Sequence, residues 1–122
     1  CIFIAMKSIL LTLIVFSSLI VSADGKKEAT QIVNPILIDV RTQAEWDDGY
    51  IETAIHIPLD KISSTIESVI EDKDQVIYLY CRSGNRSGQA EVALKSIGYV
   101  NAKNVGGIKE ASTNLRLKIL RD

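Results

Sequence analysis

Cysteine is nearly absent from this chain, which has only two in 122 residues. Cys1 precedes Met6, the expected start of translation, so Cys81 is the one cysteine expected in the finished protein. A single cysteine cannot form an internal disulfide, which excludes the disulfide-stapled class of small exported domains. Cys81 is therefore either an inert buried residue or a reactive thiol.

An excess of positive charge is also missing. The chain has 14 Lys and Arg against 15 Asp and Glu, and its formal net charge is −1 at pH 7. Proteins that bind nucleic acid usually carry a strong basic excess, so we expect no nucleic-acid partner. The length allows one domain, which at this size can bury a core without additional staples.

Apolar runs long enough to span a bilayer are lacking as well. The uncharged run over residues 8–23 is shorter than the ~20 residues that a spanning helix needs. It follows a lysine and ends in Val21-Ser22-Ala23, the small-residue pattern that signal peptidases recognise. We predict a signal peptide over residues 1–23, of which 1–5 precede the true start; an uncleaved membrane anchor is the alternative. The protein is then periplasmic or otherwise exported, without stable membrane association after cleavage.

The remaining chain predicts one α/β domain. Residues 24–34 are polar and without period, which is typical of a linker, so the folded domain is expected over residues 35–122. Short apolar, β-branched and aromatic runs predict strands. These runs cover residues 36–40, 54–57, 76–80 and 103–105.

Helix signals lie between these runs. Thr42 and Glu45 form a capping box that opens a short helix ending at Gly49. Asp60 is expected to cap a second helix, and Gly98 to end a third. A last helix is expected from residue 108 toward residue 120. The core is expected to contain Trp46, the second-helix face Ile62, Ile66, Val69 and Ile70, and the third-helix face Ala90, Ala93, Leu94 and Ile97.

Strands that alternate with helices in this way imply a parallel sheet covered on both sides. Ligands bind such folds beyond the carboxyl ends of the strands, and we expect Cys81 there, directly after the strongest strand. The small residues between Cys81 and Ser87 can turn backbone N–H groups inward to form an anion-binding nest. The next helix adds the positive end of its dipole, and Arg82 and Arg86 add two charges. These groups favour the thiolate, so we predict a lowered pKa for Cys81 and an anionic group bound beside its sulfur.

The loop Cys81-Arg82-Ser83-Gly84-Asn85-Arg86-Ser87-Gly88 resembles the active-site loop of rhodaneses, the thiosulfate sulfurtransferase family. Residues 39–46 with 54–59 resemble its "D-V-R-x-x-x-E-[WYF] … G-A-I-N-I-P" framework, and residues 98–107 resemble its closing "G-[YF] … V-x-x-L-x-G-G" segment. The similarity covers residues 36–111, and the small exported form is similar to the phage-shock-protein-E type. The resemblance implies a three-layer α/β/α rhodanese-like fold with a small, mostly parallel central sheet.

Some positions depart from the family pattern. Residues 49–54 lack the His and the second Gly of the family's usual "G-H-I-x-G-A" segment. His56 replaces the commoner Asn, and we interpret it as a half-buried strand residue and not as a base. We interpret Asp39 and Arg41 as helix-start charges acting with Glu45; support of the cysteine loop is the alternative.

The resemblance implies a covalent mechanism in which Cys81 is the catalytic nucleophile. Its thiolate attacks the outer sulfur of thiosulfate or a similar small anionic donor, sulfite leaves, and the persulfide passes sulfur to cyanide, a thiol or a thioredoxin-like protein. No metal or organic cofactor is required, and a monomer is expected. The residues implied to bind the substrate are Arg82, Ser83, Gly84, Asn85, Arg86 and Ser87.

Two other functions stay open at this point. One is a stress module that binds an anion or stores persulfide without turnover. The other is a cysteine phosphatase, which uses a C-x5-R loop with its arginine six positions after the cysteine. Here Ser87 occupies that position and Arg86 stands one residue earlier, in a shorter loop that suits sulfane sulfur better than a phosphate ester.

Overall fold

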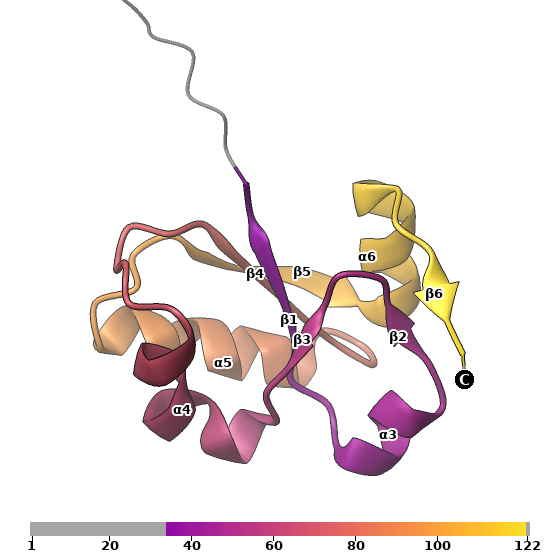
Figure 1. Ribbon diagram of the computed structural model, residues 1–122, viewed down its shortest axis with the longest axis horizontal. Coiled ribbons are helices and arrows are strands. Elements are labelled where there is room, and N and C mark those ends of the chain that lie inside the picture. Colours follow the sequence, from indigo (N-terminus) through magenta and orange to yellow (C-terminus); the bar gives the residue numbers. More distant parts are fainter. Residues whose placement is uncertain (1–33, 122) are drawn as a thin grey trace, which may run out of the picture. The chain divides into compact units, whose positions relative to one another are not determined.

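A four-stranded parallel sheet forms the centre of the domain (Figure 1). The computed structural model describes residues 34–121, so the predicted signal peptide and nearly all of the predicted linker lie outside the described residues. Every neighbouring pair of strands in this sheet is parallel, as predicted. The strands are β1 (Ile36–Asp39), β3 (Ile55–His56), β4 (Ile77–Cys81) and β5 (Ala102–Gly107), in the order β3-β1-β4-β5.

Helices cover both faces of the sheet (Figure 1). On one face, α4 (Ile62–Val69) and α5 (Asn85–Ser96) pack on a core that includes Cys81. On the other, α6 (Ile108–Leu115) packs on Leu37 and Tyr80. A small antiparallel pair, β2 (Tyr50–Ile51) and β6 (Ile119–Leu120), adjoins α6. These layers confirm the predicted α/β class and its three-layer arrangement.

Most local signals correspond to real elements. The capping box of Thr42 and Glu45 opens α3 (Gln43–Asp47), with both of its hydrogen bonds formed. The third helix ends next to Gly98, whose φ of +103° is a left-handed conformation that favours glycine. β4 lies one residue later than predicted, so Cys81 is the last residue of the strand and not the first residue after it.

Several expectations were wrong. Asp60 does not cap a helix: it lies inside a 3₁₀ turn, η3 (Leu59–Lys61), that begins after Pro58, and α4 follows without a side-chain cap. Val69 is 41% exposed, although the other three apolar residues predicted on that face are buried. Trp46 is half-buried on a helix that has no buried residue, where it stacks on Tyr50 with ring centroids 4.1 Å apart.

The last helix is shorter than predicted. α6 ends at Leu115 because Arg116 adopts a left-handed conformation with φ of 59°, and the chain then turns to pair with β2. The pairing of residues 119–120 with residues 50–51 joins segments far apart in the sequence. Neither segment has enough residues to show a strand period, so local patterns could not predict this pair.

Thr53 has a positive φ of 73°, unusual for a β-branched residue. It occupies the position of the second Gly in the family segment with which residues 49–54 were compared. The backbone therefore adopts the left-handed turn that a glycine would favour, although residue 53 is a β-branched threonine. None of the helices in the described part of the chain is long and apolar enough to cross a membrane.

Candidate functional site

Cys81 ends β4 at the carboxyl edge of the sheet, in the middle of the parallel strands. Its free thiol is fully buried, at 0% exposure. The pairing of β4 with β5 is irregular between Leu79 and Cys81, where a bulge sets the cysteine opposite Gly107. Such irregularities redirect side chains at functional sites. The buried sulfur therefore faces the turn that leads into α5.

The turn after Cys81 surrounds its sulfur with hydrogen-bond donors. Gly84 has a left-handed φ of +101° and precedes the first residue of α5. Its backbone N–H donates to Sγ of Cys81 at 2.9 Å. The buried Ser87, in the first turn of α5, places its Oγ 3.5 Å from the same sulfur.

The balance of these contacts determines the ionisation of Cys81. Burial opposes the thiolate and by itself raises the pKa, but hydrogen bonds from the Ser87 hydroxyl and the amides of Ser87, Ser83 and Gly84 outweigh it. The pKa of Cys81 is lowered from 9.0 to about 7, so a substantial part of the thiol is ionised near neutral pH. The leading stabilising contributions come from hydrogen bonds and not from the arginine charges that sequence reasoning emphasised.

Arg86 is paired with a carboxylate from a different element. Its Nη1 and Nη2 donate to Oε1 and Oε2 of Glu45 at 2.7 Å and 2.9 Å. This two-pronged hydrogen bond lowers the pKa of Glu45 to about 2 and raises that of Arg86. Sequence reasoning assigned Glu45 only to the start of α3, in its capping box and with the charges of Asp39 and Arg41. In the structure its Oε1 also accepts from the backbone of Thr42, so one carboxylate connects α3 to the cysteine loop.

The other predicted loop residues lie at different depths. Arg82, Ser83 and Asn85 are exposed, and Asn85 accepts a hydrogen bond from Gln89 along the helix at 2.9 Å. The backbone at Arg82 passes close to Gly107, where an added Cβ would lie 2.5 Å from the Arg82 carbonyl oxygen. That approach requires glycine at position 107, and it sets the start of the loop against the end of β5.

Asp39 and Arg41 form a buried pair that does not serve the helix start as interpreted from the sequence. Arg41 donates through Nε and Nη2 to both carboxylate oxygens of Asp39, and Nη2 also reaches the Gly49 carbonyl at 2.6 Å. Asp39 is therefore the main partner of Arg41, and Glu45 pairs with Arg86 instead.

His56 is half-buried on β3, as interpreted from the sequence, and its Nε2 lies 2.8 Å from the Arg41 carbonyl oxygen.

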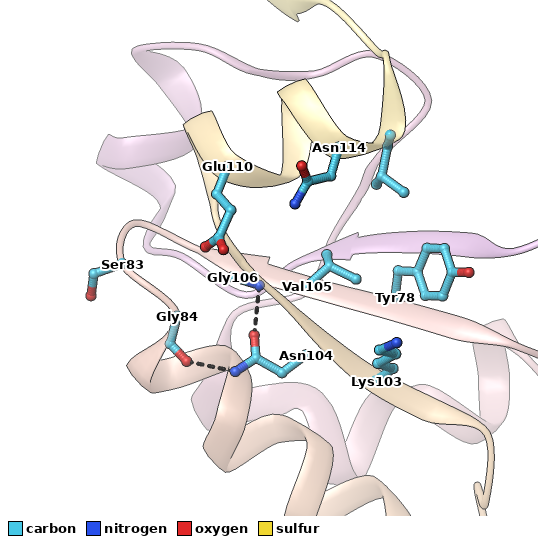
Figure 2. A pocket seen from close by; sticks show the side chains of 10 residues that line it. Tyr78, Ser83, Gly84, Lys103, Asn104, Val105, Gly106, Glu110 and Asn114 are labelled. Atoms are coloured by element: carbon cyan, nitrogen blue, oxygen red, sulfur yellow. Dashed lines mark hydrogen bonds between the residues drawn. The ribbon is translucent and has the colours of Figure 1, made fainter.

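Asn104 contacts the loop from β5, and no local sequence signal marked it. Figure 2 shows its side-chain amide between the Gly84 carbonyl and the Gly106 amide. Its Oδ1 also accepts from the Ser87 hydroxyl at 2.7 Å. Sequence reasoning missed Asn104 because it is separated from the loop along the chain, and the closing family pattern of residues 98–107 names no polar residue at its position.

Two grooves flank the loop. One, of about 590 Å³, lies between the loop, β5 and α6 (Figure 2). Its lining includes Ser83, Gly84, Lys103, Asn104, Glu110 and Asn114. The other, of about 380 Å³, lies beside Arg86 and is lined by Val40, Thr42, Pro58 and Leu59 among others. Within residues 34–121, no cluster of three or more His, Cys, Asp or Glu side chains is arranged to hold a metal ion.

Comparison with known proteins places this geometry in context. Residues 22–114 match the sequence model of the rhodanese-like domain. The chain is 36% identical over 73 residues to thiosulfate sulfurtransferase PspE of Escherichia coli K12, covering 60% of this chain and 70% of that protein. It is 40% identical over 72 residues to a sulfurtransferase of Allochromatium vinosum, covering 59% and 65%. Among solved structures, a rhodanese with anions from E. coli superimposes with a TM-score of 0.67 at 29% identity, covering 73% of this chain and all of that one.

Proposed function

Because the chain belongs to the rhodanese family, we propose that it is a sulfurtransferase in which Cys81 carries sulfane sulfur as a persulfide. The observation that carries the proposal is the Gly84 amide 2.9 Å from Sγ of a cysteine whose pKa is lowered to about 7. A thiolate at neutral pH is the form that attacks sulfur. The relatives named as sulfurtransferases support the same reaction class.

The first half-reaction breaks the S–S bond of the donor. The Cys81 thiolate attacks the outer sulfur of thiosulfate, a new S–S bond forms, and the electron pair of the broken bond leaves with sulfite. The loop amides and the basic side chains are expected to stabilise the anionic donor and leaving group. Because Cys81 is fully buried, the donor has to displace loop groups before its outer sulfur meets Sγ.

The second half-reaction releases the sulfur. Cyanide or a thiolate attacks the terminal sulfur of the Cys81 persulfide, and the Cys81 thiolate leaves as the S–S bond breaks. The donors around Sγ that favour the thiolate at the start therefore also favour it as a leaving group. A thiol of a thioredoxin-like protein is the cellular acceptor that we propose, and neither half-reaction requires a metal or an organic cofactor.

Export is part of the proposal. The signal-peptide pattern over residues 1–23 places the finished domain in the periplasm or outside the cell. The sulfur donor and acceptor must then be present in that compartment. A free thiol there also needs a reducing partner, which fits a thioredoxin-like acceptor.

The intact mass of the purified protein tests the proposal. Incubation with thiosulfate is expected to add the mass of one sulfur atom, and cyanide is expected to remove it and release thiocyanate. Cys81→Ser, the matched control, is expected to gain no sulfur and to lose turnover to background. Sulfur uptake without turnover would indicate a storage module. No uptake by an accessible thiol, together with hydrolysis of an aryl phosphate, would replace the proposal with a phosphatase.

A further inference from the structure

The half-buried Asn104 touches Gly84 and Ser87, two of the residues that donate to the sulfur of Cys81. Its Nδ2 donates to the Gly84 carbonyl at 2.9 Å, and Gly84 in turn donates its own N–H to Sγ. Its Oδ1 accepts from the Ser87 hydroxyl at 2.7 Å, and Ser87 Oγ lies 3.5 Å from Sγ. One amide side chain therefore binds the carbonyl of one residue and the hydroxyl of the other.

The position of Asn104 is itself held in three ways. Its backbone is in register with Leu79 in the β4–β5 pair. Its backbone N–H donates to Oε1 of Glu91 on α5 at 2.6 Å. Its Oδ1 also accepts from the Gly106 amide at 2.9 Å. A side chain fixed to a strand and a helix can transmit their rigidity to the loop between them.

The Ser87 hydroxyl has one proton and two acceptors within reach. The short contact with Asn104 favours donation to its amide oxygen while Cys81 is a neutral thiol. When the sulfur is ionised, the same proton can turn toward it, since donation to a charged acceptor is stronger. Asn104 Oδ1 then keeps its bond from Gly106, so no buried acceptor loses its only partner.

We propose that Asn104 is a positioning residue that holds the Gly84 turn and the Ser87 side chain beside the sulfur of Cys81. It acts through these two residues and does not touch the sulfur or the substrate. Its loss leaves the Gly84 carbonyl with one hydrogen bond, from the Gly88 N–H at 3.1 Å, and frees the Ser87 side chain to rotate, which weakens the hydrogen bonds to the thiolate. The inference rests on the proposed function only in that Cys81 is the reacting group.

The rate of Cys81 alkylation by iodoacetamide, followed against pH, tests this proposal without any sulfur donor. The probe is uncharged, and each rate is divided by that variant's plateau rate at high pH, because access to the buried sulfur can differ between variants. The normalised rate then reports the thiolate fraction. Asn104→Ala is expected to move the profile to higher pH by the effect of about one net hydrogen bond, which lowers the rate about two- to sixfold at pH 7 and about three- to tenfold well below it. Well above the ordinary thiol pKa of 9.0 the two rates are expected to converge.

Asn114→Ala is the matched control, because Asn114 is exposed on α6 and lines the same groove. It is expected to leave the profile unchanged. The charged groups that surround the loop stay in both variants, so their contributions cancel in the comparison. These groups are Arg82, Arg86 with Glu45, Glu91 with Lys95, Lys103 and Glu110.

Coupling to Ser87 gives a second measurement. If Asn104 acts partly through the hydroxyl, Asn104→Ala shifts the profile less in a Ser87→Ala background than in the original chain. Asn104→Leu keeps the approximate size of the side chain, removes its donor and acceptor and adds no charge beside the thiolate, and it replaces Asn104→Ala should that variant fail to fold.

Three results would overturn the proposal. An unchanged profile would mean that the two donors are held without Asn104. A rate lowered equally at every pH would indicate a general structural role. A profile moved to lower pH would mean that Asn104 withholds the Ser87 proton from the sulfur. None of these results depends on sulfur transfer, so failure here is distinct from a missing persulfide in the mass experiment.

Discussion

At the scale of single residues, the sulfur of Cys81 is surrounded by neutral donors. The Gly84 amide and the Ser87 hydroxyl lie next to it, and the Arg86 guanidinium is occupied by Glu45. Neutral dipoles in fixed positions can stabilise a charge without bringing a counter-ion that competes with the substrate. The loop is therefore suited to hold the thiolate beside an anionic donor, as the proposed first half-reaction requires.

The reactivity of Cys81 is expected to depend on pH around neutrality. Its folded pKa, about 7, lies below the ordinary 9.0, so the thiolate form rises as pH increases through 7 and is lost below it. Alkylation and persulfide formation are expected to follow the same curve, with a plateau at higher pH. Stopped-flow rates across this range check the expectation, and a midpoint near 9 would contradict it.

Arg86 is expected to matter most for charged donors. Arg86→Ala should raise the KM for thiosulfate several-fold more than the KM for an uncharged persulfide donor, because the charge it complements is on the donor. Glu45→Gln keeps the size of the side chain that pairs with Arg86 but removes its negative charge. It should lower the KM for thiosulfate, because the charge of Arg86 is then free to complement the donor. Steady-state kinetics with both donors measure the two KM values in each variant. Equal effects on the two donors would mean that Arg86 only shapes the loop.

At the scale of elements, the unit that carries the site is β4, the loop and α5. β4 is central in the sheet, the loop closes over the sulfur, and α5 begins at Asn85. The glycines at 84 and 107 permit the left-handed turn and the close approach to Arg82. Two neighbouring elements each contribute one residue that binds the loop or the start of α5. These residues are Glu45 from α3 and Asn104 from β5.

The turn between β2 and β3 is expected to be strained at Thr53. Its φ of 73° costs a β-branched residue about 1 kcal/mol or more, and glycine removes that cost. Thr53→Gly is therefore expected to raise the free energy of unfolding by about 1 kcal/mol. Thr113→Gly in α6, the matched control, should lower it by about 0.3 kcal/mol, the difference between the helix propensities of Thr and Gly. Chemical denaturation measures the free energy of unfolding of both variants. Destabilisation by Thr53→Gly would contradict the prediction that Thr53 is strained.

At the scale of the whole molecule, we expect the folded domain and the predicted leader to have different roles. The sheet, its helices and the site all lie within residues 34–121. The leader pattern lies in residues 1–23, outside the described residues. We therefore expect sulfur transfer to need only the domain, and location to depend on the leader.

Processing of the leader can be measured directly. Expressed whole in a bacterium, the chain is expected to yield a soluble periplasmic protein that begins at Asp24, as seen by intact mass. Ala23→Lys, which places a long charged side chain at the cut, is expected to block cleavage. A membrane-bound product that retains residues 1–23 in the unsubstituted chain would support the anchor instead.

The sequence by itself determined the alternation of strands and helices, the α/β class and the position of the cysteine loop between a strand and a helix. These follow from periodicity, capping and residue type over a few positions, as the capping box of Thr42 and Glu45 illustrates. The donors in the loop were also predictable, because they belong to residues next to Cys81 in the chain.

Only the tertiary structure decided which distant groups complete the site. Glu45 meets Arg86 across 41 positions, and Asn104 meets Ser87 across 17, because β1, β4 and β5 align their carboxyl ends at one edge. The same holds for the end of α6, where pairing with β2 overrides the helical pattern that continued toward Leu120. Such contacts depend on register and packing between elements, which no local pattern encodes.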